Sequence, residues 1–189
     1  MEYESLQEEL NIEQKKMFKK WLLETIDNEN EFKKVVKLIG KAWSVARSLK
    51  GAGTIEEKYE NVSSNLWNNR NLILGKKGSK NCYDDWNKPL KDLRVYSYQS
   101  KICFLMNPQY YGIIYDSQNT AELKRLNKEK SFTDKAITKE NWQGIVSSYY
   151  EKQKNITDLN DLNDEEIFKI DYDLWSKGAD LLTKENQND

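Results

Sequence analysis

Two charged residues stand where a short turn would bring an amine and a carboxylate together. Lys101 opens an apolar run that ends at Met106, and Asp116 precedes the next helix-like segment. Asn107-Pro108 separates them and ends the first helix, because a residue before proline avoids the helical region. If the apolar run is a buried helix, Lys101 lies at its margin and Asp116 at the mouth of the following helix. The amine and the carboxylate are then expected to face one cleft.

Apolar residues that recur at three- and four-residue steps predict the helices that would position this pair. The apolar stripe expected for the first helix is Leu6, Leu10, Met17, Trp21, Leu22 and Ile26. Thr54 to Glu57 has the pattern of a capping box, and Asp116 is a good N-cap. The pattern in residues 82–98 indicates short helical pieces joined by turns. Residues 109–115 are predicted to be extended or irregular, and Gly178 is predicted to end the last helix. The predicted helices cover residues 4–27, 30–50, 54–66 and beyond, 100–106, 116–127, 138–153 and 163–177.

These patterns predict an all-α fold, a single-domain orthogonal helical array with an aromatic-rich core. The chain of 189 residues holds 6 Trp, 11 Tyr and 5 Phe, and each ring can remove about 150–250 Å² from water. Residues 1–182 would form the domain and 183–189 a polar tail. The tryptophans expected in the core are Trp21, Trp43, Trp142 and Trp175.

The net charge of −1 conceals a segregation along the chain. Residues 61–139 carry 14 Lys/Arg against 7 Asp/Glu, whereas residues 140–189 carry 5 against 12. Such asymmetry is a hint of a polyanion-binding face beside an acidic flank, although lysine-rich surfaces are also ordinary solvated faces. If the basic segment 61–139 binds nucleic acid, the expected contact residues are Lys76, Lys77, Lys80, Arg94, Lys124 and Arg125.

Composition also excludes several kinds of chemistry. The chain has no histidine, which rules out Ser-His-Asp and Cys-His mechanisms and any His-ligated metal site. Cys82 and Cys103 lack metal-ligand spacing, and Asp84-Asp85 lacks a third ligand, so we expect no metal and no cofactor. The longest apolar run is far shorter than a membrane span, and the acidic start resembles no secretion signal. We therefore expect no membrane partner and a cytoplasmic protein.

One stretch of the sequence is similar to a known family. Ser100-Lys101-Ile102, followed by Phe104-Leu105 with Asn107-Pro108, and then Ile114-Tyr115-Asp116-Ser117 resemble the signature of bacterial proteins related to 8-oxoguanine DNA glycosylase. These are divergent members of the helix-hairpin-helix glycosylase superfamily. The segment 170–178 resembles their closing helix. The resemblance covers these segments and not the rest of the chain.

The resemblance implies a DNA-binding protein of repair or defence and assigns a role to each charged residue. Lys101 would attack the sugar C1′, displace the base and form a Schiff base, and Asp116 would activate the attack and stabilise the developing oxocarbenium ion. A lysine of ordinary pKa, about 10.4, is protonated at neutral pH, so a nucleophilic amine needs a pocket that lowers its pKa. An extruded base also needs an aromatic pocket, for which Tyr98, Tyr111 and Tyr115 are the candidates.

A second hypothesis stays open beside the enzymatic one. Lys101 could pair locally while Asp116 merely caps a helix, and the protein would then be a non-catalytic helical module that regulates or binds a protein partner. The two hypotheses differ in whether Lys101 and Asp116 line an open cleft.

Overall fold

The computed structural model describes residues 2–43, 53–75 and 96–185, and this part of the chain is helical with no strand. The all-α prediction is confirmed. Its α-helices are α1 (Glu2–Glu24), α2 (Glu29–Ala42), α3 (Ile55–Gly75), α5 (Tyr96–Met106), α6 (Pro108–Tyr111), α7 (Ser117–Lys130), α8 (Trp142–Tyr149) and α9 (Asp164–Glu185). Short 3₁₀ and π turns flank α8 and precede α9.

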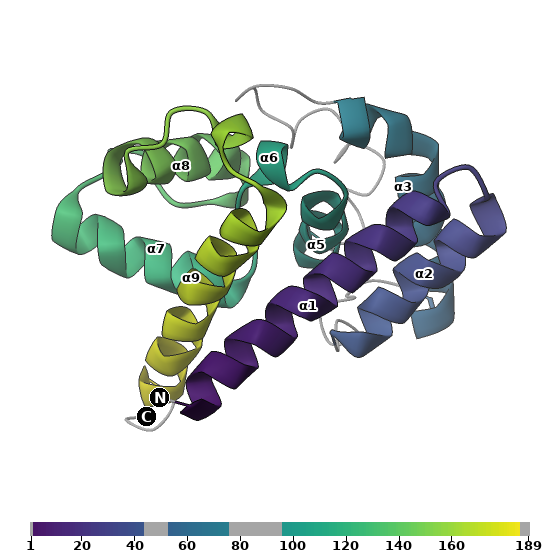
Figure 1. Cartoon of the computed structure of the whole chain (residues 1–189), viewed down its shortest axis with the longest axis horizontal. Helices are drawn as coiled ribbons and strands as arrows, with labels where there is room; N and C mark the ends of the chain where they lie inside the picture. Colours follow the sequence, from purple (N-terminus) through teal and green to yellow (C-terminus); the bar gives the residue numbers. More distant parts are fainter. Residues whose placement is uncertain (1, 44–52, 76–95, 186–189) are drawn as a thin grey trace.

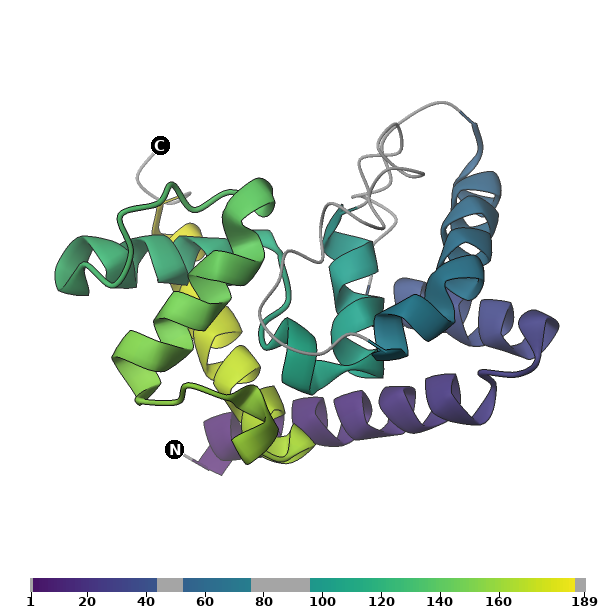
Figure 2. The same cartoon turned by 90° about the horizontal axis from the view of Figure 1, so that it is seen from above.

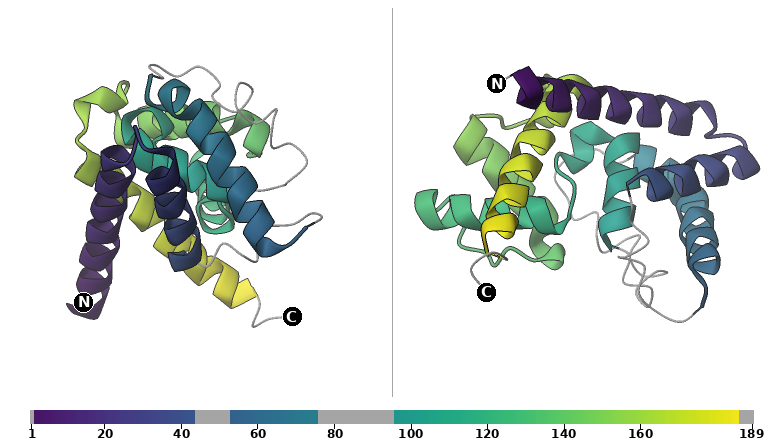
Figure 3. Two further views of the ribbon diagram at one scale, coloured as in Figure 1. Left: turned by 90° about the vertical axis from the view of Figure 1, so that its right-hand side faces the viewer. Right: turned by 90° about the horizontal axis from the view of Figure 1, so that it is seen from below.

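The helices form two groups joined by α5 and α1. Helices α7, α8 and α9 lie on one side and α2 and α3 on the other, with α5 between them (Figures 1 and 2). The long helix α1 runs along both groups and packs on α9, α5 and α2. Figure 3 shows the same arrangement from the right-hand side and from below. This crossing of α1, α5 and α9 is what positions the candidate site.

Helix α5 is the centre of the core. Ile102, Cys103, Phe104 and Leu105 are completely buried, so the helix is apolar on every side except at its first turns. A helix that is apolar all round must be surrounded by other elements. Lys101 comes directly before this run and is mostly but not completely buried, as expected for a residue at the margin of a buried helix.

Helix α1 buries a face that matches the predicted one only in part. Of the predicted residues, Leu22 is buried, whereas Leu6, Leu10 and Met17 are exposed; Ile12, Lys15 and Phe18 are also buried. Both sets have helical spacing, so periodicity alone does not choose between them. Which side chains of α1 are buried depends on which of its faces packs against α5 and α9. A lysine therefore lies on the buried face, where it requires a partner.

The last helix continues through Gly178, which was predicted to end it. Helix α9 extends to Glu185, into the segment predicted as a polar tail. A Cβ atom at position 178 would lie 1.9 Å from the carbonyl oxygen of Gln118. The glycine is thus required by the close approach of α9 to the first turn of α7 and not by a helix terminus.

Other predictions vary in outcome. Thr54 and Glu57 form the capping box, with the Glu57 amide donating to Thr54 Oγ1 at 3.2 Å and the Thr54 amide donating to the Glu57 carboxylate at 2.6 Å. Pro108 starts the short helix α6 within the segment predicted to be irregular. Trp142 is buried, Trp21 and Trp43 pack at the margin of the core, and Trp175 is 38% exposed, contrary to prediction. The predictions for 82–95 and for the end of the second helix beyond residue 43 lie outside the described residues.

Candidate functional site

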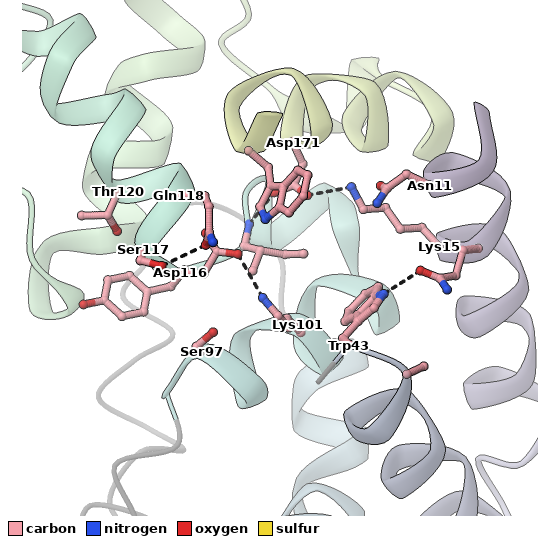
Figure 4. A pocket seen from close by; sticks show the side chains of 15 residues that line it. Asn11, Lys15, Trp43, Ser97, Lys101, Asp116, Ser117, Gln118, Thr120 and Asp171 are labelled. Atoms are coloured by element: carbon pink, nitrogen blue, oxygen red, sulfur yellow. Dashed lines mark hydrogen bonds and ion pairs between the residues drawn. The ribbon is translucent and has the colours of Figure 1, made fainter. Parts of the chain in front are cut away.

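A cavity of about 790 Å³ opens where α1, α5, α7 and α9 meet. Figure 4 shows that the labelled polar side chains around it come from all four helices. Since these helices belong to distant parts of the sequence, the cavity exists only in the folded chain. Its lining consists of Asn11, Gln14, Lys15, Ala42, Trp43, Ser97, Lys101, Ile114, Tyr115, Asp116, Ser117, Gln118, Thr120, Asp171 and Trp175.

Lys101 and Asp116 meet in this cavity. Lys101 Nζ donates to Asp116 Oδ2 at 3.0 Å, and the two side chains are 14% and 6% exposed (Figure 4). The other carboxylate oxygen, Oδ1, accepts the Asn119 amide at 2.9 Å and so caps α7. One oxygen of Asp116 is therefore used in the helix cap and the other faces the amine. The structure brings together the two residues that the sequence singles out.

Ser100 fixes the backbone between these two residues. Its hydroxyl accepts the Tyr115 amide at 3.0 Å and lies 3.0 Å from the Tyr115 carbonyl oxygen. Ser100 and Tyr115 are the direct chain neighbours of Lys101 and Asp116. This contact ties the second turn of α5 to the entry of α7 and sets the separation of the two charged groups.

A second lysine–aspartate pair lines the same cavity, and the sequence analysis did not predict it. Lys15 Nζ donates to Asp171 Oδ2 at 2.8 Å, with side chains only 4% and 2% exposed. Asp171 Oδ1 accepts the Ile114 amide at 2.9 Å and Asn119 Nδ2 at 3.0 Å. The available signal was Lys15, a charged residue in step with Ile12, Phe18 and Leu22, because a buried lysine needs an anionic partner.

Aromatic side chains complete the wall. Trp43 donates its indole N–H to Gln14 Oε1 at 2.7 Å, and its ring centroid lies 5.9 Å from Lys101 Nζ. Trp175 lines the cavity as well, and Tyr115 packs edge-on against Trp142 with 5.0 Å between ring centroids. A ligand with a planar ring and polar atoms at its edge suits such a cavity. The ring can stack on the aromatic side chains, and its edge can form hydrogen bonds with the charged groups.

Of the tyrosines predicted for a base pocket, the structure places Tyr115 at the cavity. Tyr98 is buried on the other side of α5, where its hydroxyl donates to the Val36 carbonyl of α2, and burial raises the pKa of Tyr98 well above its usual range. Tyr111 is buried against Tyr110, with 5.0 Å between ring centroids. Tyr98 and Tyr111 do not line the cavity, whereas Trp43 and Trp175 do.

The predicted nucleic-acid contacts fall in several places. Lys124 is exposed on α7. Arg125 forms ion pairs with Glu122 at 2.7 Å and Glu129 at 2.6 Å, and these carboxylates hold the pKa of Arg125 above its usual range. Neither residue lines the cavity. Lys76, Lys77, Lys80 and Arg94 lie outside the described residues.

The described part of the chain contains no group of three or more Cys, Asp or Glu side chains placed to hold a metal ion. Within the same ranges, none of the helices combines the length and apolar character needed to cross a membrane. Comparison of the chain with family models, with curated proteins and with solved structures finds no match in any of the three.

Proposed function

We propose that this protein binds DNA and cleaves the N-glycosidic bond of a damaged or modified base, with Lys101 as nucleophile and Asp116 as its acidic partner. The observation that carries the proposal is the 3.0 Å contact between Lys101 Nζ and Asp116 Oδ2 at a cavity of about 790 Å³. Cavities of about 300–1,000 Å³ hold ligands of the size of a nucleoside.

The two groups supply what the cleavage requires. The Lys101 ammonium gives up a proton, its lone pair forms a bond to the sugar C1′, and the bond from C1′ to the base breaks. Asp116 accepts the proton of the ammonium and passes it to the departing base, which takes the electron pair of the broken bond; the carboxylate, ionised again, stabilises the positive charge on the sugar. The amine bound to C1′ then loses a second proton, which Asp116 transfers to O4′; the C1′–O4′ bond breaks, and the nitrogen lone pair completes the C=N bond of the Schiff base. Its N-cap bond to the Asn119 amide keeps the carboxylate oriented throughout.

The cavity walls support binding of an extruded base. Trp43, Trp175 and Tyr115 offer aromatic surfaces, and stacking on an aromatic side chain stabilises a base by about 1–3 kcal/mol. Asn11, Gln118 and Ser97 add neutral polar groups around the same space. A flipped base is recognised by this combination of stacking and hydrogen bonds to its edge.

Covalent trapping tests the proposal. The protein is incubated with duplexes that each carry one damaged or modified base, and borohydride is added to reduce any Schiff base to a stable protein–DNA complex. We expect a complex with at least one duplex, and Lys101→Ala should abolish it. Lys177→Ala is the matched control, since this exposed lysine of α9 pairs with Asp173 away from the cavity lining. Equal trapping by the Lys101→Ala variant would refute the assignment of the nucleophile.

Salt dependence tests the DNA contact separately. Phosphate contacts release counterions, so affinity should fall steeply as the salt concentration rises. We expect the variant Lys76→Ala/Lys77→Ala/Lys80→Ala to bind more weakly and with a smaller salt slope than the wild type. Binding that is absent at low salt would contradict a DNA-binding role.

The alternative function is a non-catalytic module that binds a protein partner. The exposed Leu6, Leu10 and Met17 of α1 favour it, because they place apolar side chains along one face of a surface helix. Under this alternative, the Lys101–Asp116 pair is an element of stability alone, and no duplex yields a trapped complex.

A further inference from the structure

We infer that Asp171 is a positioning residue for Asp116, acting through Asn119 and the Ile114 backbone; this inference rests on the proposed function of the Lys101–Asp116 pair. A continuous set of polar contacts joins the two pairs. Asp171 Oδ1 accepts Asn119 Nδ2 at 3.0 Å, the Asn119 amide donates to Asp116 Oδ1 at 2.9 Å, and Asp116 Oδ2 accepts Lys101 Nζ at 3.0 Å. Figure 4 shows Asp171 and Asp116 on neighbouring walls of the cavity.

Asn119 is the link between the two carboxylates. Its side chain is completely buried, and Nδ2 also donates to the Ile114 carbonyl at 2.9 Å. The Ile114 amide in turn donates to Asp171 Oδ1 at 2.9 Å. Residue 114 is thus held through both of its backbone polar groups, two positions before Asp116. A buried network with several mutually dependent bonds restrains the orientation of each member.

Lys15 completes the arrangement by occupying the other oxygen of Asp171. With Oδ2 bound to the ammonium at 2.8 Å, Oδ1 is left to accept the two donors from the loop and from α7. The ammonium also compensates the charge of a carboxylate that is only 2% exposed. The pair therefore places a fixed, ionised acceptor on α9, opposite the segment that carries Asp116.

Two double variants separate the acceptor from the ion pair. K15M/D171N removes both charges and keeps a side-chain oxygen that can accept from Ile114 and Asn119. K15M/D171L also removes both charges, and it leaves these donors without an acceptor. Asp173→Asn is the control on the same helix, because Asp173 pairs with Lys177 at the surface.

Native-state hydrogen exchange of single amides gives a readout that does not depend on activity. In K15M/D171L we expect the Ile114 and Asn119 amides to exchange about tenfold faster than in K15M/D171N, the factor that corresponds to loss of one hydrogen bond. Amides in the middle of α7 and α9 should change equally in the two double variants. Equal exchange at Ile114 and Asn119 in the two double variants would overturn the inference, as would a uniform acceleration of all amides.

The trapping reaction gives the functional readout. In K15M/D171L we expect the rate of trapping at saturating DNA to fall about tenfold, with the half-saturating DNA concentration unchanged, since a displaced Asp116 affects the chemical step and not the DNA contact. Asp173→Asn, outside the cavity lining, should trap at the wild-type rate, and K15M/D171N should trap about tenfold faster than K15M/D171L. Equal rates in the leucine and asparagine variants would refute positioning by Asp171 while the proposed function stands.

If the wild type traps no duplex, the proposed function fails and the exchange data alone decide whether Asp171 positions Asp116. If K15M/D171L does not fold, Asn119→Ala replaces it, because this change cuts the link and leaves the Lys15–Asp171 pair intact. The same local acceleration at the amide of residue 119 is then expected, and its absence would contradict the inference.

Discussion

Asp116 combines two tasks in one side chain. Its Oδ1 caps α7 through the Asn119 amide, and its Oδ2 pairs with Lys101. Asparagine caps helices about as well as aspartate but carries no charge. Alanine provides neither a cap nor a charge. Stability and reactivity can therefore be separated at this position.

We expect Asp116→Ala to lower the free energy of unfolding by about 0.5–2 kcal/mol, the usual value of an N-cap, and Asp116→Asn to lower it by clearly less. Both variants should lose covalent trapping, because neither supplies a carboxylate beside Lys101. Urea unfolding monitored by circular dichroism measures the first effect, and borohydride trapping measures the second. Equal destabilisation by the two substitutions would show that the cap is not what Asp116 contributes to stability.

At the scale of elements, two close contacts hold α5 and α9 in place. The Tyr98 hydroxyl binds the Val36 carbonyl and its ring packs edge-on against Tyr59, with 5.8 Å between centroids, so α5 is fastened to α2 and α3. On the opposite side, Gly178 lets α9 touch the backbone of Gln118. The first contact anchors the helix that carries Lys101, and the second anchors the helix that carries Asp171.

Tyr98→Phe should keep the ring contact and lose the hydroxyl bond. We expect a loss of about 0.5–1.5 kcal/mol in the free energy of unfolding, whereas Tyr98→Ala, which also opens a cavity, should cost about 3–5 kcal/mol. Chemical denaturation of the three proteins measures both values. A Tyr98→Phe protein as stable as the wild type would mean that the hydroxyl bond makes no net contribution.

Gly178→Ala should force α9 away from α7. Because its Cβ would lie 1.9 Å from the Gln118 carbonyl oxygen, a backbone shift is required, and we expect a loss of about 1–3 kcal/mol. Gly144→Ala is the matched control within α8, where the nearest contact of an added Cβ is Lys135 Nζ at 3.9 Å. Because alanine has a higher helix propensity than glycine, Gly144→Ala should raise the free energy of unfolding by up to about 1 kcal/mol. Thermal unfolding that ranks the two variants in the opposite order would contradict this account of Gly178.

At the scale of the whole molecule, ion pairs join the first and last helices. Lys16 Nζ lies 2.7 Å from Glu165 Oε2, and Lys19 pairs with Asp164. The bond from Lys16, followed by that from Lys169, lowers the pKa of Glu165 from 4.5 to about 2. A carboxylate with a lowered pKa stabilises the fold above its ordinary pKa and loses this contribution as the pH falls toward the folded value.

The melting temperature should therefore fall as the pH is lowered from about 4.5 to about 2. Glu165→Gln should melt below the wild type at pH 7, and the difference should shrink on acidification through this window. Glu151→Gln, at an exposed position beyond α8, is the control and should follow the wild-type curve. Differential scanning calorimetry at a series of pH values measures these curves. A Glu165→Gln protein whose deficit is the same at pH 2 as at pH 7 would contradict the role given to this pair.

The local part of the site was predictable from the sequence. Lys101 and Asp116 lie only 15 positions apart in the sequence, and the signals that place them are the apolar run after Lys101, the proline at 108 and the N-cap at Asp116. Each of these acts through the backbone of neighbouring residues. The pairing of Lys15 with Asp171 has no such local signal, because the two residues come from opposite ends of the chain.

By itself, then, the amino-acid sequence determined the all-α class, most of the helices and the capping of α7, since helix periodicity and caps depend on residues close in the chain. Only the tertiary structure decided which face of α1 is buried, why Gly178 lies inside a helix, and that Trp43 and Trp175, and not Tyr98 and Tyr111, line the cavity. The physical reason is that several helical faces are almost equally apolar. Packing against partners far away in the sequence selects among them.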